Sequence, residues 1–267
     1  MILDGHSMVG FLQELYDYRA MIFNLVKRDL RGRYKGSVLG FLWNFILPAM
    51  QITVYAIVFT VVFRMNIEDY YVYLIAGMVP WIMFSDSAIA GAGCIVENMH
   101  FVSKIYFPRT VIPVSVVISK FINFLISVGI VLIILLVGGH GFSIVVLPTF
   151  FLAVVFLFLI SLGFALFLAA ADVYMKDIQY IVTVVMMLWI WLTPIMYVKN
   201  YIDNSAFQTI LSINPMTYLV EMFQDVFYWH TITNVSVVMM AFLISTFAFI
   251  VGLIVFNRTS SSFVEVM

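Results

Sequence analysis

Positive charge is concentrated in one short stretch of the sequence, immediately before a long apolar run. Five cations fall within nine residues: Lys27, Arg28, Arg31, Arg33 and Lys35. The only acid among them is Asp29, and after Gly36 no charged residue appears until Arg64. Lysine and arginine at the end of a membrane-spanning helix resist translocation and keep that end in the cytoplasm. The cluster therefore predicts the orientation of the apolar run that follows it.

The sequence lacks the motifs of nucleotide hydrolysis and of common hydrolytic enzymes. It contains no G-x-x-x-x-G-K-[ST], H-E-x-x-H or G-x-S-x-G pattern, and the GGHG at 138–141 lacks the lysine of a phosphate-binding loop. The four histidines are scattered over tails and loops, and Cys94 is the only cysteine. We therefore expect no metal site and no intrachain disulfide. Any work against a gradient must draw its energy from elsewhere.

Ionisable residues inside apolar runs are further candidates for function, because each costs roughly 2.5–3.5 kcal/mol at the centre of a membrane. Asp86 lies in WIMFSDSAIAGAGC, where it lines a polar path, pairs with a cation or is held locally by Ser85 and Ser87. Lys120 lies about a third of the way along another run and is expected to extend to the cytoplasmic surface. So few buried charges argue against an ion-coupled carrier, which needs a relay of them.

Aromatic residues make up 17% of the chain and allow two interpretations. Many belong to the belts that tryptophan and tyrosine form at the two membrane surfaces. Alternatively, rings line a path through the membrane and stack on the apolar faces of sugars, which suits a glycan better than an ion. Together with Asp86, the candidates for such a channel lining are Trp43, Tyr55, Trp81, Trp189 and Tyr197.

Composition requires that these side chains be positioned by helices in a membrane. The 267-residue chain is 64% hydrophobic and 10% charged, with a mean hydropathy of +1.10. Soluble domains are about half apolar and a quarter charged. A net charge of −1 excludes a general basic surface for nucleic acid. We expect an all-α, polytopic protein, because backbone polar groups in lipid must pair within a helix.

Six apolar runs are long enough to cross the roughly 30 Å hydrocarbon core, which takes about 20 residues. They are predicted at 38–63, 70–93, 110–137, 144–171, 178–198 and 236–256. With the N-terminus inside, the outer segments carry only Arg64 and Lys199 among the lysines and arginines. The positive-inside rule therefore places both termini in the cytoplasm.

Three further segments are not explained by spanning. Residues 1–36 are predicted to hold a cytoplasmic amphipathic helix in the membrane interface, and residues 37–267 to form the transmembrane domain. The loop 94–109 has room for a short helix before a proline and is either a docking element or a simple connector. The outer segment 199–235 contains Asn214-Pro215, a typical helix start. The helix of about 15 residues that follows it lies on the surface or re-enters the membrane.

Five motifs, in order, resemble the permease subunits of type-2 ABC exporters, which move bacterial polysaccharides such as O-antigen, capsule and teichoic acid. The motifs are RDLRGRYKGSVLGFLWNFILP at 28–48, AGMVPWIMFSDS at 76–87, ENMHFVSKIYFPRTVIP at 97–113, VYMKDIQYIV at 173–182, and WLTPIMY at 191–197 followed by NPM at 214–216. They cover nearly the whole chain. One departure is Lys176, where the family more often has arginine.

The resemblance implies that separate ATPases drive the protein. It implies a homodimer in the bacterial inner membrane, surrounded by membrane lipids, with six spans in each copy and two cytoplasmic ABC ATPase subunits. The permease itself is then no enzyme and binds no cofactor, because ATP and Mg are held by the ATPase. In the family, the segment corresponding to 94–109 holds the coupling helix. The implied ATPase contacts are Glu97, Asn98, Met99, His100, Phe101 and Lys104, with Lys176 and Asp177 as a second contact.

The resemblance also implies a substrate, an entrance and an exit. Short re-entrant helices within 199–235 would close the outer mouth, with Asn214, Pro215, Phe223 and Phe227 as gate candidates. The substrate is a lipid-linked polysaccharide, whose diphosphate suits the forked donors of arginine. We therefore hypothesise that part of the cationic cluster attracts this group to the cytoplasmic entrance: Arg28, Arg31, Arg33 and Lys35. The alternatives are a permease for a small drug or lipid, an ion-coupled carrier and a glycan-lipid transferase.

Overall fold

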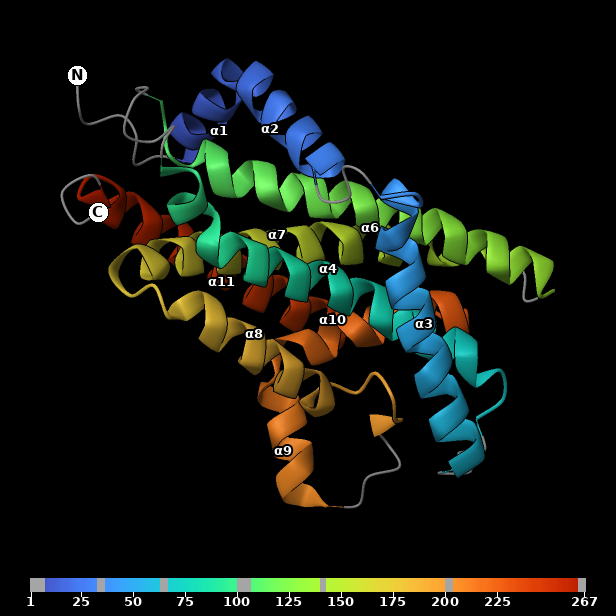
Figure 1. Ribbon diagram of the computed structural model, residues 1–267. Coiled ribbons are helices and arrows are strands. Elements are labelled where there is room, and N and C mark those ends of the chain that lie inside the picture. The colour runs from blue at the N-terminus through green and yellow to red at the C-terminus, as the bar shows by residue number, and fades with distance from the viewer. Residues whose placement is uncertain are drawn as a thin grey trace.

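The computed structural model describes residues 8–32, 37–62, 67–99, 107–139, 143–199 and 204–263 of the chain. Within these ranges the protein is all-helical, with ten α-helices and no strand (Figure 1). Five apolar helical segments are long enough to cross a membrane: Phe45–Val62, Tyr70–Glu97, Val111–Val137, Ile144–Tyr174 and Val235–Ser260. Five of the six spans predicted from the sequence are therefore present as long helices.

The N-terminal segment forms two helices where the sequence predicts one. Helix α1 spans Met8–Asp17 and α2 spans Arg19–Gly32, with a turn between them at Tyr18. The buried face of α2, which includes Ile22 and Val26, packs along α6 (Val111–Val137). The helix α2 is therefore held against the bundle, and its opposite face is exposed.

Helix α3 (Trp43–Ile57) is preceded by a short 3-10 turn and continues as a π-helical turn, Val58–Val62. It contacts mainly α4 (Tyr70–Glu97) and lies at the side of the molecule (Figure 1). Only 6% of its apolar span is buried. Most of its hydrophobic side chains are therefore left for lipid or for another protein.

The helices α4, α7 (Leu147–Tyr174) and α11 (Val235–Ser260) form the tightly packed part of the bundle, which we call the scaffold. Where α7 meets α11, a Cβ atom on Gly252 would lie 2.1 Å from the carbonyl oxygen of Gly163. Where α4 meets α7, a Cβ atom on Gly91 would lie 2.6 Å from that of Ala165. Small residues thus let the three backbones approach more closely than side chains would permit.

The predicted span at 178–198 is shorter than expected. Helix α8 covers Ile178–Trp189 and ends in a 3-10 turn, Ile190–Leu192. These 15 residues rise only about 22 Å, which is less than the hydrocarbon thickness. The chain is extended at Thr193, because the residue before a proline resists the helical conformation. Two tyrosines of α4 then hold the following segment, since Tyr70 and Tyr73 donate hydrogen bonds to backbone carbonyls at 2.6 and 3.0 Å.

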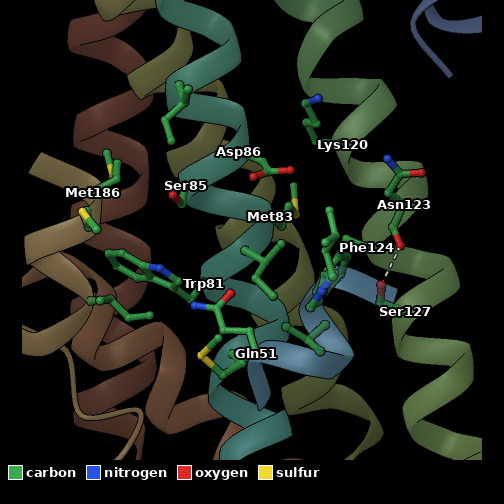
Figure 2. A pocket seen from close by; sticks show the side chains of 18 of the residues that line it. Gln51, Trp81, Met83, Ser85, Asp86, Lys120, Asn123, Phe124, Ser127 and Met186 are labelled. Atoms are coloured by element: carbon green, nitrogen blue, oxygen red, sulfur yellow. Dashed lines mark hydrogen bonds between the residues drawn. The ribbon is translucent and has the colours of Figure 1, made fainter. Parts of the chain in front are cut away.

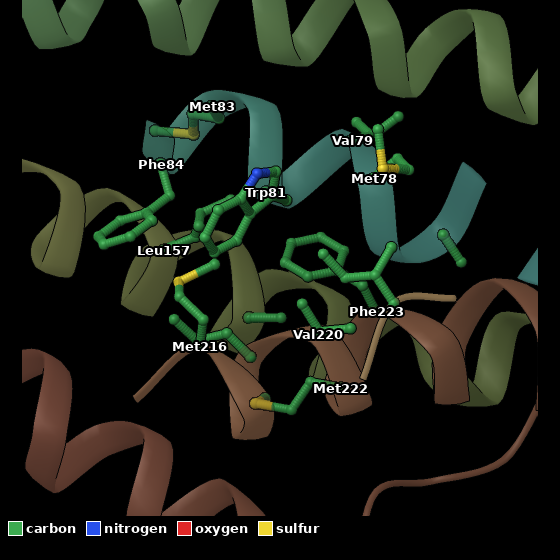
Figure 3. Packing of buried hydrophobic residues seen from close by; sticks show 14 of the residues in the cluster. Met78, Val79, Trp81, Met83, Phe84, Leu157, Met216, Val220, Met222 and Phe223 are labelled. Carbon is green, nitrogen blue, oxygen red and sulfur yellow. The ribbon is translucent and has the colours of Figure 1, made fainter. Parts of the chain in front are cut away.

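Two short helices follow, α9 (Ser205–Ile213) and α10 (Pro215–Gln224), and a π-helical turn continues α10 over Asp225–Trp229. The predicted helix start is confirmed, because Asn214 caps α10 and Pro215 is its first residue. Helix α10 is enclosed by other helices of the protein, as the re-entrant placement requires. Eight of its ten residues are buried, and it packs against α4, α7 and α11 (Figure 3).

Candidate functional site

The main cavity lies between α3, α4, α6 and α8 and has a volume of about 720 Å³. One part of its wall is aromatic and includes Trp43, Tyr55 and Trp81. The other part is polar and comes largely from α4 and α6, as Figure 2 shows. Rings beside hydrogen-bonding groups suit a ligand that has both apolar faces and hydroxyl groups, such as a sugar.

Helical periodicity places the polar groups of α6 on one face. Lys120, Asn123 and Ser127 follow one another at three- and four-residue spacing and line the cavity across from Asp86 on α4 (Figure 2). Ser127 donates a hydrogen bond to the backbone carbonyl of Asn123 at 3.0 Å. Sequence reasoning considered Lys120 alone and missed Asn123 and Ser127. Their spacing from Lys120 was the signal that could have found them.

Four of the six predicted channel-lining residues lie together on this cavity: Trp43, Tyr55, Trp81 and Asp86. Trp189 and Tyr197 lie outside its lining. Trp189 packs edge-on against Trp81, and its indole N–H donates to Asn214 at 3.0 Å. The Tyr197 hydroxyl donates to the carbonyl of Trp191 at 3.1 Å. Both residues therefore support the end of α8 and the segment that follows it.

A second cavity of about 380 Å³ lies between α2, α4, α6 and α8. Its lining includes Asp29, Glu97 and Gln179, and it shares Ile89 and Thr183 with the main cavity. The two cavities therefore adjoin. The second one lies toward the end of the bundle where α4 ends and α8 begins.

An ion pair between a buried lysine and a partly exposed aspartate stands between the two cavities. The Lys120 ammonium lies 3.9 Å from the carboxylate of Asp29, and the Ser119 hydroxyl donates a hydrogen bond to the same carboxylate. Lys120 is only 2% exposed, because α2 covers it. The expectation that Lys120 extends to the surface is therefore wrong. Asp29, which the sequence showed only as the one acid in the cationic cluster, is the ion-pair partner of Lys120.

The predicted ATPase contacts that the structure describes gather at the end of the bundle that includes the second cavity. Glu97 is exposed at the end of α4, and Met99 is half-buried. Asn98 accepts a hydrogen bond from Arg28 at 2.6 Å, which ties α2 to the end of α4. Lys176 and Asp177 are exposed in the turn between α7 and α8. His100, Phe101 and Lys104 lie outside the residues that the structure describes.

Of the predicted entrance residues, the structure describes two. Arg28 and Arg31 are both exposed near the end of α2. Arg28 is engaged with Asn98, whereas the side chain of Arg31 lies beyond that contact on the same helix. Arg33 and Lys35 lie outside the described residues.

Three of the four predicted outer-gate residues lie in the interior, and Pro215 is half-buried. The Asn214 side chain accepts hydrogen bonds from Trp189 and from the backbone of Met216, and it donates to the carbonyl of Leu192 at 2.8 Å. Asn214 therefore joins the end of α8 to the start of α10. Phe223 and Phe227, at 0% and 2% exposure, pack in a ring cluster with Phe124 and Phe150.

Comparison with known proteins gives the family. The model of the ABC-2 type transporter family matches residues 21–228, which is most of the chain and includes every helix that lines the two cavities. The chain belongs to the ABC-2 type transporter family. The resemblance drawn from the motifs is therefore confirmed. As a permease of this family, the chain is the membrane component, and ATP is hydrolysed by a separate subunit.

Three relatives match over most of their length. The O-antigen export system permease protein RfbA of Myxococcus xanthus is 36% identical over 87% of this chain and 89% of its own. A Klebsiella pneumoniae protein of the same name is 28% identical over 95% of this chain and 96% of its own. The polysialic acid transport protein KpsM of Escherichia coli is 22% identical over 75% and 78%.

Proposed function

We propose that this chain is the transmembrane permease of an ATP-driven exporter that moves a lipid-linked, O-antigen-like polysaccharide across the bacterial inner membrane. The observation that carries this proposal is the main cavity, with its aromatic wall facing a polar one, in a chain related along its length to O-antigen permeases. Aromatic faces hold sugars without binding them tightly, so that a long polymer can slide.

The working unit is a homodimer with two ABC ATPase subunits. The α3 and α8 helices expose apolar side chains on the side of the molecule where they also line the main cavity; examples are Leu47, Val54, Val184 and Met187. A second copy placed against this face, which we call the α3–α8 face, would enclose the cavity in a continuous path. Coupling helices within 94–109 and the turn at Lys176-Asp177 would receive the ATPases, which hold ATP and Mg.

The chain crosses the membrane six times, with both termini in the cytoplasm. In this arrangement α8 and the extended segment after it make the fifth crossing, and α9 and α10 re-enter from the outer side. The burial of α10 supports this arrangement, because backbone at membrane depth must be enclosed by protein. Residues 1–36 lie at the cytoplasmic surface beside the ATPase, and 37–267 form the transmembrane domain.

Export in cells tests the proposal. A strain that lacks its own polysaccharide permease is given this chain with its cognate ATPase, and the polysaccharide on the cell surface is measured. We expect export with both proteins and none with either alone. The purified permease should hydrolyse no ATP by itself. Failure of the pair to export any lipid-linked glycan, with both proteins assembled, would reject the proposal.

The entrance hypothesis has a separate test. Orienting a helix requires positive charge of either kind, whereas binding a diphosphate favours guanidinium. We expect Arg28→Lys and Arg31→Lys to assemble normally and to export more slowly. Normal export by both variants would show that the cluster serves topology alone.

A further inference from the structure

The side chain of Lys120 carries a buried charge without a hydrogen-bond partner in the described part of the chain. The side chain is buried and belongs to the wall of the main cavity, and its ammonium is turned toward Asp29. No group among the described residues accepts a hydrogen bond from it. The 3.9 Å separation from Asp29 is longer than a hydrogen bond. A buried cation that uses none of its three donors is costly unless a ligand satisfies it at some stage.

Asp29 occupies the place that an anionic ligand of Lys120 would take. Its carboxylate lines the second cavity, whereas Lys120 lines the main one, so the pair stands between them. Asp29 is one-third exposed and is carried by α2, an element outside the core of the bundle. It can therefore be displaced at less cost than Lys120, which is fixed on α6.

Resting on the proposed function, we propose that Lys120 is a binding residue for the diphosphate of the lipid carrier, and that Asp29 holds the site until that group displaces it. When Asp29 leaves, the Ser119 hydroxyl becomes available beside the ammonium. Asn123 lies one turn further along the same face of α6 and adds an amide donor. A phosphate group, with several oxygens, accepts hydrogen bonds from all of these donors at once.

The surrounding acids keep this site from trapping its ligand. Asp86 faces Lys120 across the main cavity, and Glu97 lines the second cavity. Both repel an anion, so the diphosphate is bound only while it is directly at Lys120. A transport pathway requires this balance, because the ligand must be able to leave. The guanidinium groups of Arg28 and Arg31 on α2 attract the diphosphate toward the second cavity from outside.

Equilibrium binding to the intact permease–ATPase complex in lipid nanodiscs tests the assignment. The probe is radiolabelled farnesyl diphosphate, with inorganic pyrophosphate and farnesol as competitors. We expect Lys120→Gln to weaken binding at least tenfold and Lys120→Arg to stay within about threefold of the wild type. Because Asp29 competes with the ligand, Asp29→Asn should strengthen binding several-fold. Lys199→Gln, which removes a cation outside both cavities, should bind as the wild type does.

The outcomes separate a binding role from a structural one. If the pair only fixes α2 to α6, Asp29→Asn and Lys120→Gln will both lower the unfolding temperature. The two substitutions will then not shift the dissociation constant in opposite directions, and that result would overturn the assignment. If inorganic pyrophosphate competes as well as unlabelled farnesyl diphosphate does, the claim that the site binds a lipid-linked diphosphate would be overturned. Polysaccharide export by the wild type is measured in parallel, so that loss of the proposed function is distinguished from loss of this site alone.

Discussion

Helices α3 and α4 are neighbours in the chain and both are apolar, yet they are used in opposite ways. The span of α3 has a mean hydropathy of 2.1 and is 6% buried, whereas that of α4 has a mean hydropathy of 1.5 and is 67% buried. The less hydrophobic helix is therefore the more enclosed one. Lipid solvates apolar side chains as well as protein does, so hydropathy cannot select the core in a membrane.

Small residues and hydrogen bonds distinguish the two regions instead. The scaffold of α4, α7 and α11 is joined at Gly91, Gly163 and Gly252, where the backbones nearly touch. The α3–α8 face has no such contact among its described residues; it carries Trp43 and Tyr55, which are part of the aromatic wall of the main cavity. In the proposed exporter, the scaffold would be the rigid half that holds the fold, and the α3–α8 face would be the open half that meets the substrate and the second copy.

The largest expected effect is in the scaffold. Gly252→Ala would place a methyl group 2.1 Å from a backbone oxygen of α7, so that the helices must separate. We expect a loss of about 3 kcal/mol or more in the free energy of unfolding. The matched control is Gly129→Ala on α6, where no atom lies within 4 Å of the new methyl group. It should leave stability unchanged or raise it by up to about 1 kcal/mol. Unfolding of both variants in detergent measures the difference, and equal stabilities would refute the rigid-scaffold interpretation.

The α3–α8 face is tested by cross-linking. Met187 is 73% exposed at the edge of the main cavity, and Phe247 on α11 is 69% exposed. In membranes treated with a short thiol cross-linker, Met187→Cys should give mostly dimers and Phe247→Cys mostly monomers. The natural Cys94 is buried and should not react. The reverse pattern would place the contact between copies on the scaffold side.

A smaller loss is expected where α8 joins α10. Asn214→Ala removes a buried side chain that makes hydrogen bonds to Trp189, Leu192 and the start of α10, and we expect destabilisation by about 2 kcal/mol. Asn204→Ala removes an exposed cap of α9 and should cost at most about 1 kcal/mol. Thermal unfolding of the two variants checks the difference, and equal losses would show that Asn214 only caps its helix.

A further effect concerns pH. Burial raises the pKa of Asp225 to about 6, and nearby Glu221 adds to the rise. The folded protein therefore disfavours the ionised carboxylate, and stability should fall as the pH rises from about 4 to about 6 and then level off. Asp225→Asn should flatten this part of the curve when the unfolding temperature is followed between pH 4 and pH 7. Parallel curves for the two proteins would assign the slope to another group.

The sequence predicted what depends on local chemistry. Five long spans follow from apolar length, and the start of α10 follows from Asn214-Pro215. Pro194 also contained the signal that α8 stops at Leu192, because the residue before a proline avoids the helix, but the apolar run continues past it and concealed the end.

Features that depend on packing between distant segments could not be predicted in this way. The pairing of Lys120 with Asp29 joins residues 91 positions apart and requires α2 to lie on α6. The same is true of Trp189, which supports Asn214 and lies outside the cavity lining, although its residue type fits a channel. Residue type identified the candidate residues. Only the packing of the helices shows which of them line the cavity and which support the helices around it.

The most direct measurement places a photoreactive benzoylphenylalanine at two positions of equal exposure during active export. Trp191, in the 3-10 turn that follows α8, lines the main cavity and is 50% exposed; Phe242, on α11, is 49% exposed on the scaffold side. If the α3–α8 face lines the export path, illumination will attach polysaccharide to the protein with the probe at 191 and not to the one with the probe at 242. Attachment at 242 alone, or equally at both, would contradict it.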